Sequence, residues 1–333
     1  IRLCISDFQR ILLQYQVELN KDIMKGRFFI LLLLFVSIHC LWAGNYNSNE
    51  KVTKVDNDLK VSAGTVDRYF FHSDFVDARN VDIWLPEDYS AKKKYAVLYM
   101  HDGQMLYDAG KAWNAKEWDV ETIVTQLYKE KKIRNVIVVG VYNNGNKRHI
   151  EYFPQKTIQY IEEPERSKLM GLLLEAPLAD AYLKFLVTEL KPFIDKNYST
   201  KTDQENTFLC GSSMGGLISI YGMCEYPNIF GGVACLSTHW IGTFDNNKQI
   251  PAGINEYLKR HLPSPIGHKI YFDHGTVGLD ANYPEYQKQV DMIVTKAGYD
   301  KKTFQSLEFP GEDHNEKYWS SRLYIPLTFI LAE

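Results

Sequence analysis

The sequence predicts an α/β domain of three layers, in which helices cover both faces of a mostly parallel central sheet. Short apolar runs recur along the chain, and they are continuous rather than alternating, as in strands that are buried on both faces. Segments with the three- and four-residue spacing of amphipathic helices lie between these runs. The 333 residues are 45% hydrophobic and 14% aromatic, which is enough for one large core.

The predicted elements follow one another in chain order. Strands are expected at 81–86, 95–103, 135–143, 207–213, 231–237, 268–275 and 303–309. Helices are expected at 178–194, 216–224, 287–297 and 318–331. Pro192 is expected to break or kink the first helix, because proline lacks the backbone N–H that a helix interior uses. Strands that alternate with helices over one length indicate a three-layer α/β domain.

The N-terminal part of the chain has the layout of an export signal. Positive residues follow Met24, an apolar run covers 28–38, and Ala43 offers a cleavage site. The apolar run is too short to span a bilayer comfortably, so no stable membrane span is expected. We therefore interpret 1–43 as an upstream extension followed by a signal peptide, and the protein as exported to a periplasm or out of the cell.

The remaining chain divides into a short linker and one domain. Residues 44–60 are polar and predict a linker, and 61–333 predict the folded domain. Lipid attachment at Cys40 is disfavoured, because the residues before it fit a lipoprotein signal poorly. The three cysteines that follow Ala43 form no CxxC pair, which argues against a disulfide framework.

Charge and motif content exclude several classes of function. The net charge is −3, from 41 acidic and 38 basic residues, and no block of lysines and arginines could follow a phosphate backbone. Nucleic acid is therefore not an expected partner. The sequence has no HExxH motif and no cysteine ligand pair, and no Walker loop or GxGxxG turn follows a predicted strand. Neither a metal nor a cofactor is expected.

The segment GSSMG, residues 211–215, follows a predicted strand and precedes a predicted helix. It matches the pattern G-x-S-x-G, in which a sharp turn holds a serine in a strained conformation and glycines avoid collisions with neighbouring elements. In this pattern Ser213 is the nucleophile, whereas Ser212 is a packing or turn residue. The backbone N–H of Met214 would stabilise the oxyanion of a tetrahedral intermediate. A glycine-rich turn without chemistry is the alternative interpretation.

A serine nucleophile needs a base, usually a histidine that a carboxylate orients. His314 lies in a Gly- and acid-rich turn after the last predicted strand, and it is preferred as the base over His274 at the end of an earlier strand. The acid is expected in the loop that precedes the last strand. Asp280 is preferred there because it has room to reach His314, and Asp273 is the alternative.

Loops after the other predicted strands complete the expected site. In the loop 101–104, Gln104 is expected to supply the second oxyanion N–H, while the alternative is that His101 and Asp102 bond each other and only shape this loop. Five aromatic residues are expected to line the pocket, where rings could stack on a sugar or phenolic ring, with core packing as the alternative for the tryptophans. They are Trp113, Trp118, His239, Trp240 and Trp319.

Taken together, five ordered blocks of the sequence resemble a known family. They are VLYMHDGQMLYD (97–108), NVIVVGVYNNGNKRHIEYFP (135–154), CGSSMGG (210–216), DHGTVGLDANY (273–283) and HNEKYWSSRL (314–323). The chain is similar to the putative esterases of the esterase D and enterochelin esterase type, which include the feruloyl and acetyl-xylan esterases of carbohydrate esterase family 1. The resemblance covers nearly all of 65–333.

The resemblance implies an α/β-hydrolase fold with Ser213, Asp280 and His314 as the catalytic triad. It also implies that Arg148, Glu151 and Tyr152 hold the framework of the site, with an ion pair expected between Arg148 and Glu151. The expected function is therefore that of an exported serine carboxylesterase, acting on a sugar-linked acyl or feruloyl ester or a related polysaccharide ester. The alternatives are a siderophore trilactone esterase, an acyltransferase and a non-catalytic binding protein with the same fold.

Overall fold

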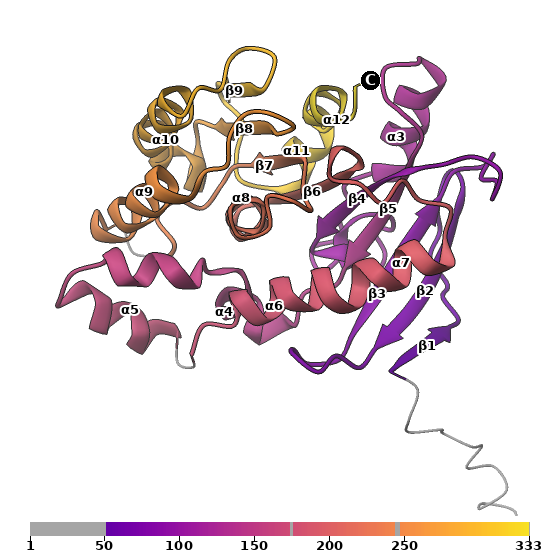
Figure 1. Cartoon of the computed structure of the whole chain (residues 1–333), viewed down its shortest axis with the longest axis horizontal. Helices are drawn as coiled ribbons and strands as arrows, with labels where there is room; N and C mark the ends of the chain where they lie inside the picture. Colours follow the sequence, from indigo (N-terminus) through magenta and orange to yellow (C-terminus); the bar gives the residue numbers. More distant parts are fainter. Residues whose placement is uncertain (1–50, 174–175, 244–246, 333) are drawn as a thin grey trace, which may run out of the picture. The chain divides into compact units, whose positions relative to one another are not determined.

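A nine-stranded sheet forms the middle layer of the domain (Figure 1). The computed structural model describes residues 51–332 apart from 174–175 and 244–246, so the expected signal peptide lies outside the described residues. The strands are β1 (Val52–Val55), β2 (Thr65–Phe71), β3 (Arg79–Leu85), β4 (Ala96–His101), β5 (Val136–Val141), β6 (Thr207–Ser212), β7 (Gly232–Leu236), β8 (Lys269–Gly275) and β9 (Phe304–Phe309). Their order in the sheet is β1-β2-β3-β5-β4-β6-β7-β8-β9.

The sheet is mostly parallel, as the sequence predicts. The pairs β1–β2, β2–β3 and β3–β5 are antiparallel, and every pair from β5–β4 to β8–β9 is parallel. The parallel part places the carboxyl ends of β4 to β9 at one edge of the sheet. Ligands of open α/β sheets bind at this edge.

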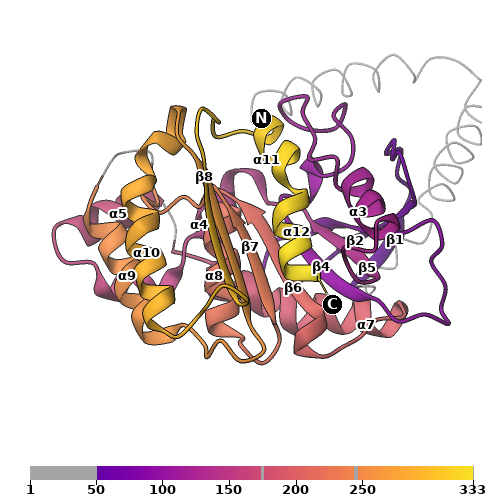
Figure 2. The same cartoon turned by 90° about the horizontal axis from the view of Figure 1, so that it is seen from above.

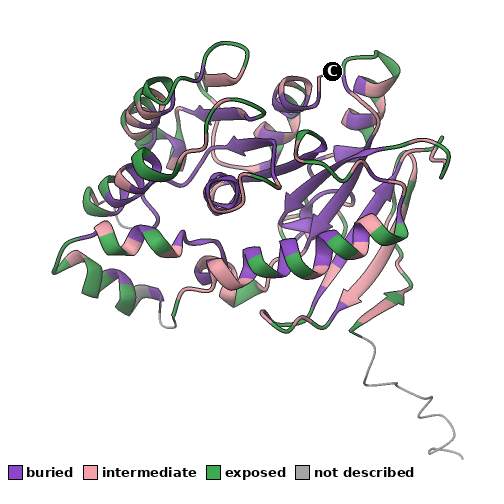
Figure 3. Cartoon of the chain, viewed as in Figure 1, coloured by how far each residue is buried: buried purple, intermediate pink, exposed green. Residues whose placement is uncertain are grey.

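Strands β3 to β9 confirm the seven predicted strands to within two residues at each end. The sequence did not predict β1 and β2, and β1 lies inside the expected linker 44–60. Both strands are only partly buried, which Figure 3 shows as mixed colours at that edge of the sheet. Both strands contain polar residues and therefore lack a continuous apolar run. One of these residues, Arg68 on β2, donates two hydrogen bonds of 2.7 Å to Asp82 on β3.

Helices cover both faces of the sheet (Figure 2). On β4, Val97 and Tyr99 join one core cluster, whereas Ala96, Leu98 and Met100 join the other, because successive side chains of a strand point to opposite faces. The first face packs against α6 (Ala179–Phe185), α7 (Lys191–Asn197), α8 (Met214–Glu225), α9 (Gln249–His261) and α10 (Pro284–Lys296). The second packs against α3 (Val120–Lys129), α11 (Glu316–Arg322) and α12 (Tyr324–Leu331). The three-layer prediction is thus confirmed.

Two predicted helices differ in detail from the observed ones. The helix expected at 178–194 continues through Pro192, because a widened π turn at Leu186–Leu190 joins α6 to α7 ahead of the proline and Pro192 occupies the first turn of α7. The helix expected at 318–331 is divided at Leu323 into α11 and α12. Helices α3, α9, α4 (Arg148–Tyr152) and α5 (Glu165–Leu173) were not predicted. Among the described residues, no helix has the length and apolar character needed to cross a bilayer.

Candidate active site

Ser213 lies at the sharp turn between β6 and α8. Its backbone has φ 57° and ψ −122°, a conformation that a residue with a side chain adopts only under strain. Two hydrogen bonds hold this turn against the neighbouring strand and loop. The N–H of Ser213 donates to the carbonyl of Leu236 at 2.9 Å, and the N–H of His239 donates to the carbonyl of Ser213 at 3.1 Å. The turn therefore places the serine at the carboxyl edge of the sheet.

The flanking glycines let the strand and the helix approach closely. A Cβ atom on Gly211 would lie 2.7 Å from the backbone of Gly215, and one on Gly216 would lie 2.8 Å from the hydroxyl of Thr238. These distances are shorter than any ordinary contact between such atoms, so a side chain would displace backbone at Gly211. Of the two glycines of the motif, Gly211 thus has a steric reason in this structure, whereas a Cβ atom on Gly215 would lie 3.4 Å from its nearest neighbours.

His314 and Asp280 lie together at the same edge. The Nδ1 atom of His314 is 2.5 Å from Oδ1 of Asp280. The other carboxylate oxygen accepts the hydroxyl of Ser237 at 2.6 Å and the N–H of Gly275 at 2.7 Å. Burial alone would raise the pKa of Asp280, but the hydrogen bonds and the charge of His314 outweigh it and lower the pKa. Asp280 is therefore held as a carboxylate, oriented toward the imidazole.

The two alternative residues are engaged elsewhere. Asp273 is fully buried and accepts hydrogen bonds from Arg322 at 2.9 Å and from the hydroxyl of Tyr271 at 3.0 Å. The ring of His274 bonds the carbonyl of Gly275 at 2.7 Å. Asp280, not Asp273, thus accepts the hydrogen bond of His314, and this geometry favours the preferred acid and base over Asp273 and His274.

A cavity of about 280 Å³ joins the serine to the histidine. Ser213 and His314 both line it, and so do three of the expected aromatic residues, Trp113, Trp118 and Trp319. The rings of Trp118 and Trp319 lie 5.6 Å apart, and the ring of Trp319 meets His314 edge to face at 4.9 Å. The structure therefore gathers the predicted nucleophile, the predicted base and an aromatic wall around one cavity.

Residues 74–329 match the family described as "Putative esterase". The chain belongs to this family. The esterase shares 26% identity over 262 residues with YjcH of Bacillus subtilis (strain 168). The alignment covers 77% of this chain and 93% of that protein. It shares 26% identity over 189 residues with an endo-1,4-beta-xylanase/feruloyl esterase of Xylanibacter ruminicola, covering 53% of this chain but 22% of that protein.

Solved structures with the same fold include two kinds of esterase. A CE1 ferulic acid esterase from Anaeromyces mucronatus, in complex with ferulic acid, is 21% identical with a TM-score of 0.55, over 82% of this chain and 93% of that one. The enterobactin esterase FES from Shigella flexneri is 15% identical with a TM-score of 0.59, over 82% of this chain and 60% of that one. These structural similarities establish the fold, and the family match establishes a carboxylic ester hydrolase.

His239 and Trp240 of the esterase do not line the cavity, contrary to expectation. Trp240 is 1% exposed, packs edge-on against Phe272 at 5.4 Å and donates its indole N–H to Gln287 at 2.8 Å. His239 is buried, and its Nδ1 lies 2.7 Å from the hydroxyl of Tyr283. Burial, reinforced by nearby His314, lowers the pKa of His239 to about 3. Trp240 is a core residue, and the backbone N–H of His239 supports the turn at Ser213.

The expected oxyanion donors lie at the start of two helical segments. Met214 begins α8, and Gln104 lies in the short segment η1 (Gly103–Met105). The first N–H groups of a helix have no partner within it, so both positions leave N–H groups for other acceptors. The side-chain oxygen of Gln104 accepts the N–H of Asn143 at 3.2 Å, which fixes the loop. Their role in the reaction stays a prediction.

Arg148 and Glu151 of the esterase do not pair with each other, so that expectation is wrong. Arg148 binds both carboxylate oxygens of Asp102 at 2.7 Å each, and its guanidinium lies over the ring of Tyr152 at 5.2 Å. Asp102 therefore does not bond His101, whose Nδ1 instead lies 2.8 Å from the hydroxyl of Tyr182. The pair of Asp102 and Arg148 lines the cavity.

Glu151 forms a buried ion pair with Arg79 on β3, through hydrogen bonds of 2.6 and 2.9 Å. We expect Glu151→Ala to lower the free energy of unfolding by about 3–5 kcal/mol, because it leaves the guanidinium buried and unpaired. Urea denaturation measures this loss. Glu87→Ala, which removes an exposed partner of Lys129, is the control and should cost less than about 1 kcal/mol. Equal losses in the two variants would contradict the prediction.

Several residues of the esterase line the cavity although the sequence did not place them in the pocket. They are Asp102, Met105, Asn114, Asn143, Arg148, Ser212, Asn315 and Glu316. Asn315 and Glu316 directly follow His314, and this position beside the predicted base is the feature of the sequence that could have identified them. Within the described residues, no group of three His, Cys, Asp or Glu side chains is arranged to hold a metal.

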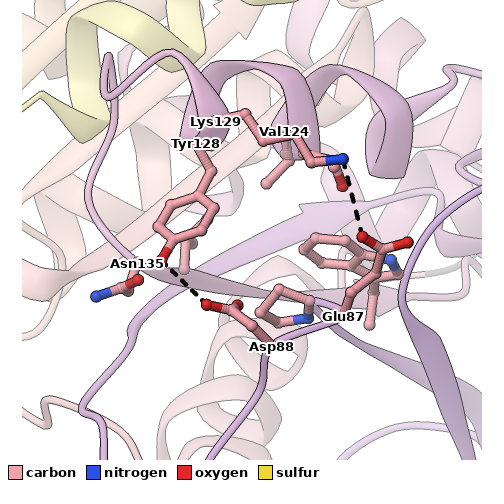
Figure 4. A pocket seen from close by; sticks show the side chains of 10 residues that line it. Glu87, Asp88, Val124, Tyr128, Lys129 and Asn135 are labelled. Carbon is pink, nitrogen blue, oxygen red and sulfur yellow. Dashed lines mark hydrogen bonds and ion pairs between the residues drawn. The ribbon is translucent and has the colours of Figure 1, made fainter.

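A second cavity, of about 220 Å³, lies between the end of β3 and α3 (Figure 4). Figure 4 shows Lys129 facing Glu87 at 3.8 Å and the hydroxyl of Tyr128 bonding Asp88 at 3.2 Å across it. None of the predicted catalytic or pocket residues lines this cavity. The predicted nucleophile and base line the other cavity.

Proposed function

We propose that this esterase is a serine carboxylesterase in which Ser213 is the nucleophile, His314 the general base and Asp280 the group that orients it. The observation that carries the proposal is the bond of 2.5 Å between Asp280 and His314 beside the strained Ser213, with both Ser213 and His314 lining one cavity. A hydroxyl becomes an effective nucleophile only when such a base accepts its proton.

The reaction follows from these positions. The hydroxyl oxygen of Ser213 attacks the carbonyl carbon of the ester while Nε2 of His314 takes its proton, and the carboxylate of Asp280 stabilises the imidazolium. The N–H groups of Met214 and Gln104 stabilise the oxyanion. When the tetrahedral intermediate collapses, the alcohol leaves with the proton of His314. Water then attacks the carbonyl carbon of the acyl-enzyme and gives a proton to His314. When this second tetrahedral intermediate collapses, His314 returns the proton to the oxygen of Ser213 and the acid is released.

The substrate we propose is an acyl ester of a sugar, such as a feruloyl or polysaccharide ester. The aromatic rings of Trp113, Trp118 and Trp319 around the cavity support this choice, because such rings stack on sugar and phenolic rings. The feruloyl esterase among the relatives acts on the same kind of bond. We also propose that the enzyme is exported, on the basis of the charged and apolar segments after Met24.

A fluorophosphonate probe tests the proposed nucleophile. We expect one equivalent of probe on the peptide that contains Ser213, measured by mass spectrometry after digestion. Ser212→Ala is the matched control, because it removes the neighbouring hydroxyl and should still be labelled. A folded protein that the probe does not modify would instead be a non-catalytic binding protein. Labelling on Ser212 would show that Ser212, and not Ser213, is the nucleophile.

A further inference from the structure

Asn315 occupies the position before α11 where an asparagine side chain usually caps the helix. Its side chain makes no capping hydrogen bond here. Its Oδ1 atom is buried, and among the described residues it has no hydrogen-bond partner. The residue lines the same cavity as Ser213. A buried acceptor without a partner is unfavourable, so a rotation of this side chain toward the cavity would let the oxygen accept a hydrogen bond from a ligand.

Glu316 adds a second acceptor to the same wall. It is only 6% exposed, lines the cavity, and accepts the side-chain N–H of Asn114 at 2.5 Å. Asp102 and Arg148, the other charged residues that line the cavity, neutralise each other through two hydrogen bonds. Glu316 therefore leaves the cavity with a net negative charge.

The cavity thus combines aromatic rings with hydrogen-bond acceptors. Its rings can cover the apolar face of a flat or puckered ring, while Asn315 and Glu316 accept hydrogens from hydroxyl groups at that ring's edge. The unpaired negative charge disfavours a carboxylate on the ligand, because like charges repel in a site that is partly closed to water.

We propose that Asn315 and Glu316 are specificity-determining residues that accept hydrogen bonds from free hydroxyls on the ring of the ester substrate. The shared chemistry is a ring that carries hydroxyl donors, from either a sugar alcohol or a phenolic acyl group. This inference rests on the proposed function, because the ring is bound at the cavity where Ser213 attacks.

Matched pairs of esters test the inference in the whole enzyme. The sugar pair is methyl 2-O-acetyl-xyloside with its other hydroxyls free or O-methylated, and the phenolic pair is methyl 4-hydroxycinnamate and methyl 4-methoxycinnamate. In at least one pair, we expect kcat/KM to be about 10- to 100-fold higher for the hydroxylated ester. The pair that shows the preference identifies the source of the hydroxyl.

Variants connect this preference to the two residues. Asn315→Ala and Glu316→Ala should each reduce the ratio of kcat/KM within the preferred pair toward one, whatever they do to the absolute rate. Asn315→Asp keeps an acceptor and should keep most of the ratio. Asn228→Ala, at an exposed position between α8 and the amino end of β7, is the control and should leave the ratio unchanged.

Hydrolysis of 4-nitrophenyl acetate, which has no hydroxyl, distinguishes a failure of the inference about Asn315 and Glu316 from a failure of the proposed serine mechanism. The inference about Asn315 and Glu316 is wrong if 4-nitrophenyl acetate is hydrolysed but neither the sugar pair nor the phenolic pair shows a preference. It is also wrong if no ester of these two pairs is hydrolysed. In both cases the serine mechanism stands. If no ester of the set, including 4-nitrophenyl acetate, is hydrolysed by the folded protein, the proposed function itself fails.

Discussion

Ser213→Ala is expected to lower kcat by about 10⁶-fold, the loss found when the nucleophile of a comparable triad is removed. The hydroxyl oxygen forms the bond to the acyl carbon, and the remaining groups can only orient the ester and stabilise charge. Alanine keeps the Cβ atom and therefore the steric demands of the turn at φ 57°, so the fold should be unchanged. Steady-state kinetics with 4-nitrophenyl acetate, together with circular dichroism, measures both effects.

The matched control for this prediction is Ser212→Ala. Ser212 ends β6 and precedes the proposed nucleophile, but its side chain has no step in the proposed reaction. Its replacement should therefore leave kcat within about tenfold, a change of about 1.4 kcal/mol in the barrier. Retention of more than about 1% of the activity by Ser213→Ala, in protein free of wild-type enzyme, would rule out Ser213 as the nucleophile.

Asp280→Asn is expected to lower kcat by about 10⁴-fold. The hydroxyl of Ser237 and the N–H of Gly275 both donate to one oxygen of Asp280, so the asparagine should place its oxygen there and its amide N–H toward His314. The imidazole would then accept at Nδ1 and carry its proton on Nε2. In that tautomer it cannot take the proton of Ser213.

Asp273→Asn separates the two candidate acids. Asp273 pairs with Arg322 in the core, so its replacement should lower the free energy of unfolding by several kcal/mol and leave kcat of the folded protein within about tenfold. Urea denaturation and kinetics on the soluble fraction measure the two quantities. A larger loss of kcat in Asp273→Asn than in Asp280→Asn would reverse the assignment of the acid.

The sequence predicted the fold best where the chain is most buried. Strands such as β5, VIVVGV, are apolar throughout, because both faces of the parallel sheet are covered, and such runs are visible without a structure. The edge strand β1 and its neighbour β2 mix polar and apolar residues, since both are only partly buried and ionic pairs such as Arg68–Asp82 replace apolar contacts. The sequence pattern of an edge strand resembles that of a polar linker.

The site was predictable where a local pattern determines geometry. The glycines around Ser213 and the order of Ser213, Asp280 and His314 are local or ordinal features, and these residues lie at one edge of the sheet. Ion pairs are different, because Arg148 bonds a residue 46 positions away and Glu151 one 72 positions away. Only the folded sheet brings such partners together.

The sequence also did not distinguish the tryptophans that line the cavity from the one that lies in the core. Trp118 and Trp319 line the cavity, whereas Trp240 lies in the core. All three are large aromatic residues close to the ends of strands or helices, so residue type did not distinguish them. The direction of each side chain depends on the local backbone, as at Ser237, which has a φ of 43° and lies three residues before Trp240.

Ser237 itself connects several parts of the site. Its hydroxyl donates to Asp280 at 2.6 Å and accepts the indole N–H of Trp319 at 2.9 Å and a guanidinium N–H of Arg322 at 3.0 Å. One donor and two acceptors exhaust the hydrogen-bonding capacity of a hydroxyl. A substitution at Ser237 would therefore disturb three other residues at once: Asp280, Trp319 and Arg322.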